Sequence, residues 1–278
     1  MKNNLWKILC MAPLAVFLCV FTLLPILRTI GLSFHSMHHP GITLRTYGEL
    51  LGEPAFRRAF INTLLIAGFS LGIELAFGLT LALLTSHRSR LNAWMRPLFI
   101  LPLAVPTTVV GVIMSYLFSS SGWLNRILSD LRIIGKPVHW MSGGMESIIM
   151  VTAADCWKVA PLVMLILLAG LQSIDRSLYR AARIDGAGTL CIFRRITLPL
   201  LIPSITVAVV IRGIDAFRIF ALPLILMGQN LKVLGTYAYL EYAEFNNVHT
   251  SAASAVILLA LIMSGVAAYT HLAGRGTR

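Results

Sequence analysis

Charged side chains are scarce in this chain. Asp, Glu, Lys and Arg make up only 12% of its 278 residues, whereas hydrophobic residues make up 57% and the mean hydropathy is +0.81. So little charge cannot cover the surface of a soluble domain of this length. The composition therefore excludes an ordinary soluble protein and predicts an all-α integral membrane protein.

Cysteine is also scarce, and the few cysteines are scattered. The four of them form no C-x-x-C pair, and they fall in or beside apolar runs or in one loop: Cys10, Cys19, Cys156 and Cys191. A disulfide framework or a zinc site is therefore not expected. Three histidines stand at helical metal-ligand spacing, but Pro40 follows them and no acidic or cysteine partner matches them: His35, His38 and His39. We expect an interfacial turn there, and no metal site.

The chain has no phosphate-binding loop. The pattern G-x-x-x-x-G-K-[ST] is missing, and Gly135-Lys136 is followed by Pro137 without the upstream glycine. The chain is therefore not expected to be an ATPase, or any other enzyme, because its ionisable residues form no catalytic set at a diagnostic spacing. Nucleic-acid binding is disfavoured as well, since the basic residues belong to no soluble domain with aromatic stacking positions.

Six apolar runs are each long enough to cross a bilayer, which takes about 20 helical residues for ~30 Å of hydrocarbon. They are residues 8–32, 59–85, 97–118, 147–171, 200–227 and 248–272. No linker or low-complexity tract separates them, so residues 1–278 are expected to form a single transmembrane domain. Helices three and four should kink at their prolines, namely Pro97, Pro102, Pro106 and Pro161.

The distribution of Lys and Arg predicts the orientation of these spans. If the N-terminus is cytoplasmic, the inside segments contain twelve Lys and Arg and the outside segments contain seven. The positive-inside rule then places both termini and residues 172–199 in the cytoplasm. The first run is too long for a signal-peptide core and has no clear cleavage site, so we expect an uncleaved helix.

Residues 172–199 are a basic segment punctuated by glycine and proline. Asp175 is a suitable N-cap for a helix that runs to Ile184, and Gly186 supplies a left-handed C-cap. The apolar residues on one side of this helix are expected to form a docking face: Leu178, Ala181, Ala182 and Ile184. A basic loop that is merely attracted to anionic lipid is the alternative.

A second helical piece is expected in the same segment, from Thr189 to Thr197. Proline disfavours helical backbone in the residue before it, so Pro199 is predicted to mark the next boundary. The fifth span would then begin at residue 200.

This segment resembles the "EAA" loop of permease subunits in binding-protein-dependent ABC importers. Paired alanines are followed four residues later by a glycine, and ten residues after that glycine by Ile-x-Leu-Pro. The resemblance implies that eight positions couple the chain to an ATPase: Arg180, Ala181, Ala182, Asp185, Gly186, Ile196, Leu198 and Pro199. Arg180 departs from the pattern, because the motif opens with glutamate. The implied fold is the six-helix, MetI-like permease fold with a cytoplasmic coupling helix.

Two stretches are similar to the carbohydrate branch of that family, the maltose-type and glycerol-phosphate-type first permeases. These are residues 185–199 and residues 215–223, although the Gly-Gly-Pro turn usual after the second stretch is absent. The resemblance implies an importer of a sugar or related polyol in the bacterial inner membrane. It also implies the partners: a different second permease, two ATPase subunits that bind ATP and Mg²⁺, and an extracytoplasmic solute-binding protein.

Six ionisable residues within the apolar runs are candidates for the substrate pathway. They are Glu74, Asp155, Lys158, Arg212, Asp215 and Arg218. Charges are costly in a membrane unless they face protein or water. Spacing of i, i+3 places Asp155 beside Lys158 and Asp215 beside both arginines. These residues therefore either contact the solute or neutralise one another and hold helices together.

Two other transport functions remain open. An ion-coupled secondary transporter would use Glu74, Asp155 or Asp215, but no convincing inverted repeat is visible. An importer permease for a phosphorylated polyol would bind the phosphate with Arg212 and Arg218. Neither alternative requires a cofactor in this chain.

Overall fold

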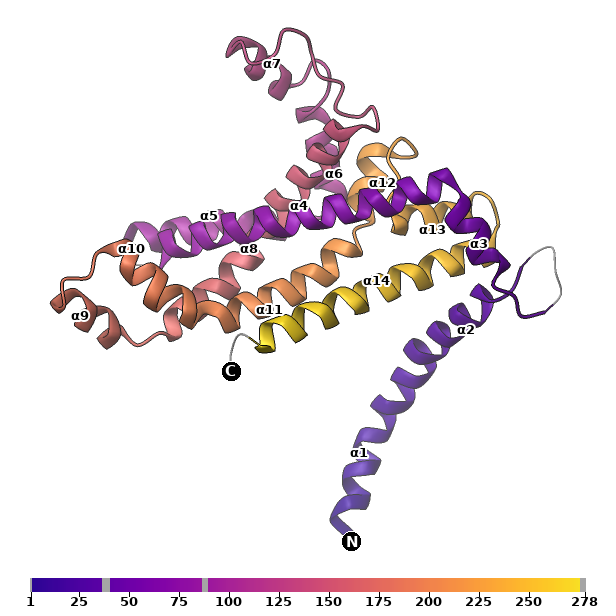
Figure 1. Ribbon diagram of the computed structural model, residues 1–278, viewed down its shortest axis with the longest axis horizontal. Helices are drawn as coiled ribbons and strands as arrows, with labels where there is room; N and C mark the ends of the chain where they lie inside the picture. Colours follow the sequence, from indigo (N-terminus) through magenta and orange to yellow (C-terminus); the bar gives the residue numbers. More distant parts are fainter. Residues whose placement is uncertain (1, 37–40, 87–89, 276–278) are drawn as a thin grey trace. The chain divides into compact units, whose positions relative to one another are not determined.

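The computed structural model describes residues 2–36, 41–86 and 90–275, and helices dominate all three ranges (Figure 1). Two of the helical segments, η1 and η2, are π-helical. In chain order the segments are α1 (Lys2–Leu18), η1 (Cys19–Leu23), α2 (Leu24–Ser33), α3 (Arg45–Gly52), α4 (Pro54–Thr85), α5 (Arg90–Ala104), α6 (Thr107–Leu117), α7 (Trp123–Asp130), α8 (Met145–Ser173), α9 (Arg176–Ile184), α10 (Thr189–Ile192), η2 (Phe193–Thr197), α11 (Leu198–Phe217), α12 (Ala221–Met227), α13 (Leu234–Ala243) and α14 (Val248–Arg275).

The helices confirm a multi-pass membrane protein. Five of those described are long and apolar enough to cross a bilayer: Cys10–Ser33, Pro54–Thr85, Met145–Ser173, Thr189–Phe217 and Val248–Leu272. A sixth crossing would combine Trp94–Ala104 with Thr107–Leu117. The prediction of six spans therefore depends on this pair.

The predicted third span, residues 97–118, is not one straight helix. The chain bends by 96° between α5 and α6. Of the three prolines in this run, only Pro106 breaks the helix, because its φ of −56° and ψ of 141° are extended and its nitrogen has no hydrogen to donate. Pro97 and Pro102 lie inside α5 without ending it.

The predicted fifth span, 200–227, was misplaced at both ends. Its helix begins at Thr189 and continues through Pro199 to Phe217, and α12 follows as a separate short helix. The predicted boundary at Pro199 is wrong because η2 widens the helix just before it, so that Leu198 donates to the carbonyl of Phe193, five residues back.

The N-terminal helix accommodates Pro25 in the same way. In η1, the N–H of Leu24 donates to the carbonyl of Cys19, again five residues back. A π-helical turn before a proline supplies room that an ordinary α-helical turn lacks. The helix therefore continues past Pro25, as it does past Pro199.

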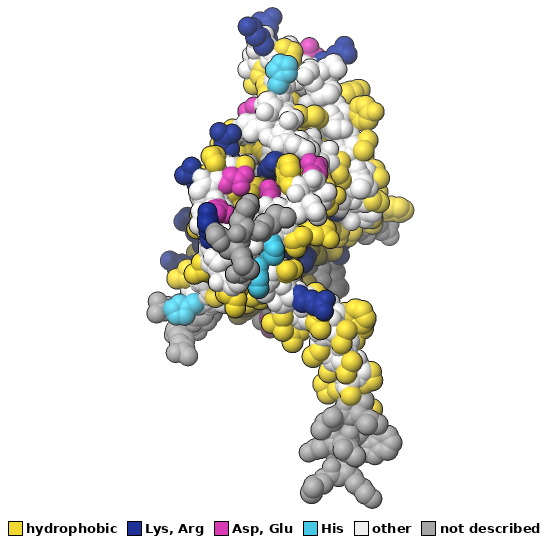
Figure 2. Space-filling view, turned by 90° about the vertical axis from the view of Figure 1, so that its right-hand side faces the viewer, with side chains coloured by type: hydrophobic (Ala, Val, Ile, Leu, Met, Phe, Trp, Pro, Cys, Tyr) yellow, Lys and Arg dark blue, Asp and Glu magenta, His cyan; other side chains and the backbone are white. Residues whose placement is uncertain are grey.

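By contacts, the chain divides into two compact units. Unit 1 contains Met1–Arg58 and Leu234–Ala260, and unit 2 contains Ala59–Val233 and Leu261–Arg278. In unit 1, the ring of Phe56 packs edge-on against Tyr237 at 5.5 Å, and the Tyr237 hydroxyl donates to Glu53 at 2.5 Å. Burial and this hydrogen bond raise the pKa of Tyr237. The N-terminal helix of unit 1 buries none of its apolar window, and Figure 2 shows hydrophobic side chains along it.

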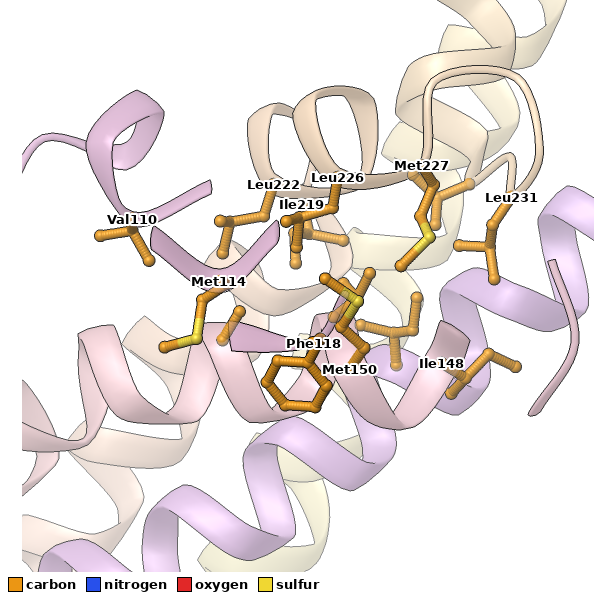
Figure 3. Packing of buried hydrophobic residues seen from close by; sticks show 14 residues of the cluster. Val110, Met114, Phe118, Ile148, Met150, Ile219, Leu222, Leu226, Met227 and Leu231 are labelled. Atoms are coloured by element: carbon orange, nitrogen blue, oxygen red, sulfur yellow. The ribbon is translucent and has the colours of Figure 1, made fainter. Parts of the chain in front are cut away.

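Helix α8 is the centre of unit 2. It packs against α5, α6, α11 and α12, and 61% of its apolar window is buried. Next to it, side chains of α6 and α12 converge with those of α8 in one apolar cluster that includes Met114, Met150 and Met227 (Figure 3). A second cluster joins α4, α8 and α11 around Val163, Leu167 and Leu201.

Two glycines allow the helices of the second cluster to approach closely. A Cβ at Gly78 of α4 would lie 2.7 Å from a methyl of Val163, and one at Gly170 of α8 would lie 2.1 Å from the Ser204 hydroxyl of α11. In lipid, such close packing replaces the hydrophobic driving force that joins helices in water.

We expect Gly170→Ala to lower the free energy of unfolding by about 1–3 kcal/mol, because the new methyl overpacks the contact between α8 and α11. Thermal unfolding of the purified protein in detergent measures the effect. Gly213→Ala in α11 is the matched control: a Cβ there meets nothing within 4 Å, and alanine favours the helix. Equal melting temperatures for Gly170→Ala and the wild type would contradict the packing role.

Candidate functional site

Helix α9 begins and ends where the sequence predicted. The carboxylate of Asp175 accepts the N–H of Ser177 at 2.8 Å, and this bond lowers the pKa of Asp175. At the other end, Gly186 has φ +74° and donates to Arg183 at 3.1 Å, while Ala187 donates to Ala182 at 2.9 Å. This pair of bonds is the Schellman motif, which requires a residue in the left-handed region.

The apolar side of α9 faces outward. No residue of the helix is buried, and the exposed fractions of Leu178 and Ile184 are 43% and 86%. A tyrosine on its inner side contacts the next helix, with the Tyr179 hydroxyl 3.2 Å from that of Thr197. An exposed apolar face on an ordered, capped helix is the form expected of a docking element.

The predicted coupling residues divide between α9 and the helix that follows it. Arg180, Ala181 and Ala182 lie on α9, and Asp185 and Gly186 form its C-terminal cap. Ile196, Leu198 and Pro199 belong instead to the helix Thr189–Phe217, which runs from the loop into the apolar segment. The motif therefore spans the exposed helix α9 and the start of a long apolar helix, joined by a short turn.

The structure brings three of the predicted pathway residues together in a buried charge cluster: Glu74, Asp155 and Arg212. The guanidinium of Arg212 makes two bonds of 2.7 Å to the two carboxylate oxygens of Glu74 and one of 3.1 Å to Asp155. The side chains of Glu74, Arg212 and Asp155 are 0%, 3% and 8% exposed. The cluster joins α4, α8 and α11, since each helix supplies one residue.

Asp215 extends the cluster toward the surface. One of its oxygens lies 3.8 Å from Arg212, and the other accepts a bond of 3.0 Å from Arg218. The predicted pairing of Asp215 with both arginines is therefore confirmed. Because the Arg218 side chain is 69% exposed, its guanidinium is the one accessible cation of the cluster.

The predicted pairing of Asp155 with Lys158 is wrong. Lys158 donates instead to the hydroxyl of Thr107, the first residue of α6. Asp155 is buried beside Arg212, whereas Lys158 lies one turn further along α8 and is only part-buried. No sequence signal indicated Thr107, because the sequence around a threonine in an apolar run does not show which distant side chain it will contact.

The described residues include no group of three His, Cys, Asp or Glu side chains that could hold a metal ion. Of the three spaced histidines, His35 bonds to the carbonyl of Gly31 through Nδ1 at 2.8 Å. His38 and His39 lie outside the described residues.

Comparison with known proteins matches most of the chain to one family of transport proteins. Residues 74–277 match the family described as "Binding-protein-dependent transport system inner membrane component". The trehalose/maltose transport system permease MalF of Thermococcus litoralis is 35% identical over an alignment of 222 positions, which covers 78% of this chain and 75% of the relative. The sulfoquinovosyl glycerol transport system permease SmoG of Agrobacterium fabrum is 31% identical over an alignment of 281 positions, which covers 97% of this chain and 91% of the relative.

The fold has a close match among solved structures. A chain of a bacterial ABC transporter involved in the import of the acidic polysaccharide alginate superposes with a TM-score of 0.87, covering 100% of this chain and 98% of its own. The two sequences are 24% identical, so this match concerns the fold alone.

Proposed function

This chain belongs to the family of binding-protein-dependent transport system inner membrane components, and from that membership we propose that it forms part of the translocation path of an ATP-driven importer for a sugar or a related polyol. It is a multi-pass inner membrane protein with the ABC importer permease fold. The proposed solute class is supported by two relatives more than 30% identical, whose names refer to trehalose/maltose and to sulfoquinovosyl glycerol.

The observation that carries the proposal is the exposed, capped helix α9 at the start of a continuous membrane helix. We propose that α9 docks on an ATPase subunit, which binds the ATP and Mg²⁺. Closure of the two ATPases would move α9, and the helix from Thr189 to Phe217 would transmit that movement to Arg212 in the charge cluster.

The remaining partners and the orientation belong to the same proposal. A binding protein delivers the solute from outside, as the family description implies, and a different permease completes the pore. We propose that both termini and α9 lie in the cytoplasm, and the excess of Lys and Arg in the corresponding segments, twelve against seven, supports this orientation.

The charge cluster weakens the phosphorylated-polyol alternative. Arg212 already donates to two carboxylates, so only the exposed Arg218 is available to a phosphate. The ion-coupled alternative is disfavoured by the family, whose transport depends on a binding protein.

We expect uptake by the full complex in proteoliposomes to require ATP and the binding protein. The solute is chosen first by thermal shift of the cognate binding protein against sugars, polyols and their phosphates. Labelled solute should then accumulate with ATP inside and should stay near background with a non-hydrolysable analogue. Accumulation driven by an ion gradient, with the ATPase subunits absent, would instead establish a secondary transporter.

A further inference from the structure

Two adjoining clefts lie in the segment between α6 and α8, apart from the sites described above. The first has a volume of about 270 Å³, and its lining includes Phe118, Ser120, His139, Trp140 and Ser142. The second has a volume of about 270 Å³, and its lining includes Ser120, Ser121, Arg126, Ser129 and Asp130. Ser120 lines both, so the two clefts adjoin one another.

A buried asparagine holds the walls of both clefts in place. The side-chain nitrogen of Asn125, a residue only 3% exposed, donates to the carbonyls of Ser119, Ser120 and Val138 at 3.0–3.2 Å. Its oxygen accepts the N–H of Val138 at 3.1 Å and the indole N–H of Trp140 at 3.2 Å. Asn125 thus connects α7 to the residues just before this helix, Ser119 and Ser120, and to the loop after it at Val138 and Trp140.

Ser147 of α8 and the ring of Phe118 also hold the loop that carries Trp140. The hydroxyl of Ser147 donates to the carbonyl of Trp140 at 2.7 Å and accepts the N–H of Gly143 at 2.8 Å. The ring of Phe118 packs edge-on against the indole at 5.3 Å and 87°. The first cleft is therefore formed before any ligand arrives, and a preformed site does not have to order its loops on binding.

The chemistry of the lining suits a carbohydrate. Aromatic rings offer an apolar surface to the C–H face of a sugar, and serine hydroxyls and an imidazole donate to and accept from sugar hydroxyls. In the first cleft, Ser120 lies 3.3 Å from Nδ1 of His139, and Ser142 donates to Glu146. In the second cleft, Arg126 and Asp130 bring charges of both signs, so neither cleft is a dedicated anion site.

The clefts lie on the side opposite to the docking helix. They adjoin the first residue of α8, and α9 follows its last residue, so 29 helical residues separate them by about 43 Å. If α9 is cytoplasmic, the clefts face the side from which solute enters.

We propose that the two clefts form a carbohydrate-binding site for about two sugar rings, separate from the charge cluster and the transmembrane path. This inference rests on the proposed sugar-importer function. Its test therefore measures binding and transport in separate assays.

The binding assay uses the assembled permease and ATPase complex in nanodiscs, without the binding protein. Maltotriose and trehalose are the probes and glycerol 3-phosphate is the charged comparison, all observed by saturation-transfer difference NMR. Maltotriose should bind, and His139→Ala and Ser120→Ala should each weaken it by about fivefold, the loss of about one hydrogen bond. The controls His271→Ala and Ser264→Ala, at exposed positions of α14, should leave its binding unchanged.

Three outcomes would overturn the site. The first is no sugar signal from a wild-type complex that imports sugar normally, which leaves the proposed function intact. The second is equal weakening by the cleft variants and the α14 controls. The third is that the cleft variants change only the half-saturating concentration of the binding protein, which would make the clefts a contact for that protein. A wild-type complex that imports no sugar at all contradicts the proposed function instead.

Discussion

Replacing Arg212 with leucine is expected to lower the free energy of unfolding by about 3–5 kcal/mol and to abolish transport. The substitution leaves Glu74 and Asp155 without their shared cation in a buried site, and an uncompensated buried charge carries a cost of that size. Thermal unfolding in detergent and uptake in proteoliposomes measure the two effects. An Arg212→Leu protein as stable as the wild type would refute the buried cluster.

The nearby Arg218 supplies the matched control. Its side chain is 69% exposed and, among the described residues, forms its ion pair with the partly exposed Asp215, so Arg218→Leu should change stability by less than about 1 kcal/mol. A reduced rate of uptake in this stable variant would support a contact between Arg218 and the solute.

A triple replacement separates packing from transport within the cluster. Buried ion pairs replaced by apolar residues of similar volume often leave stability unchanged or raise it. The variant Glu74→Leu, Asp155→Leu, Arg212→Met should therefore recover most of the stability lost in Arg212→Leu. Recovery of transport as well would show that the cluster only holds α4, α8 and α11 together, whereas recovery of stability alone would place it in the translocation path.

Replacing Gly186 with valine is expected to uncouple ATP hydrolysis from uptake and to leave membrane insertion intact. Gly186 has φ +74°, where an L-residue costs about 1–2 kcal/mol and a β-branched one costs more. A strain of about 2 kcal/mol shifts a conformational equilibrium about thirtyfold away from the capped helix. A Cβ at Gly186 meets nothing within 4 Å, so the effect arises in the backbone and not from a clash.

Gly188 provides a control only two residues away. Its φ is −71° and a Cβ there also meets nothing within 4 Å, so Gly188→Val should retain coupled uptake. Gly186→Asn should lie between the two, because asparagine tolerates the left-handed region. ATP hydrolysis and uptake are measured on the same proteoliposomes, and normal coupling in Gly186→Val would contradict the role of the cap.

The features predicted correctly from the sequence are those that depend on neighbouring residues. The caps of α9 are formed by Asp175 with Ser177 and by Gly186 with Arg183, over two or three residues. Such bonds depend on local residue types, which the sequence displays directly. The pairing of Asp215 with Arg218 belongs to the same class, since i, i+3 neighbours share one face of a helix.

The course of the helices around their prolines was predicted only in part. Pro106 breaks its helix, whereas Pro199 does not, although both follow residues that can be helical. A π-helical turn precedes Pro199, whereas Pro106 itself has an extended backbone. No residue type in the π-helical turn Phe193–Thr197 indicates it in the sequence.

The sequence alone therefore determined that the chain lies in a membrane, that it is helical and which family it belongs to. The lengths of the apolar runs, the distribution of charge and the loop motif are all properties of consecutive residues. Only the tertiary structure decided which buried charges meet: Arg212 is 138 residues from Glu74 and 57 from Asp155. The clefts beside Trp140 likewise depend on Asn125 being folded against it. In lipid a buried charge must find a partner, but the packing of α4, α8 and α11 selects which one.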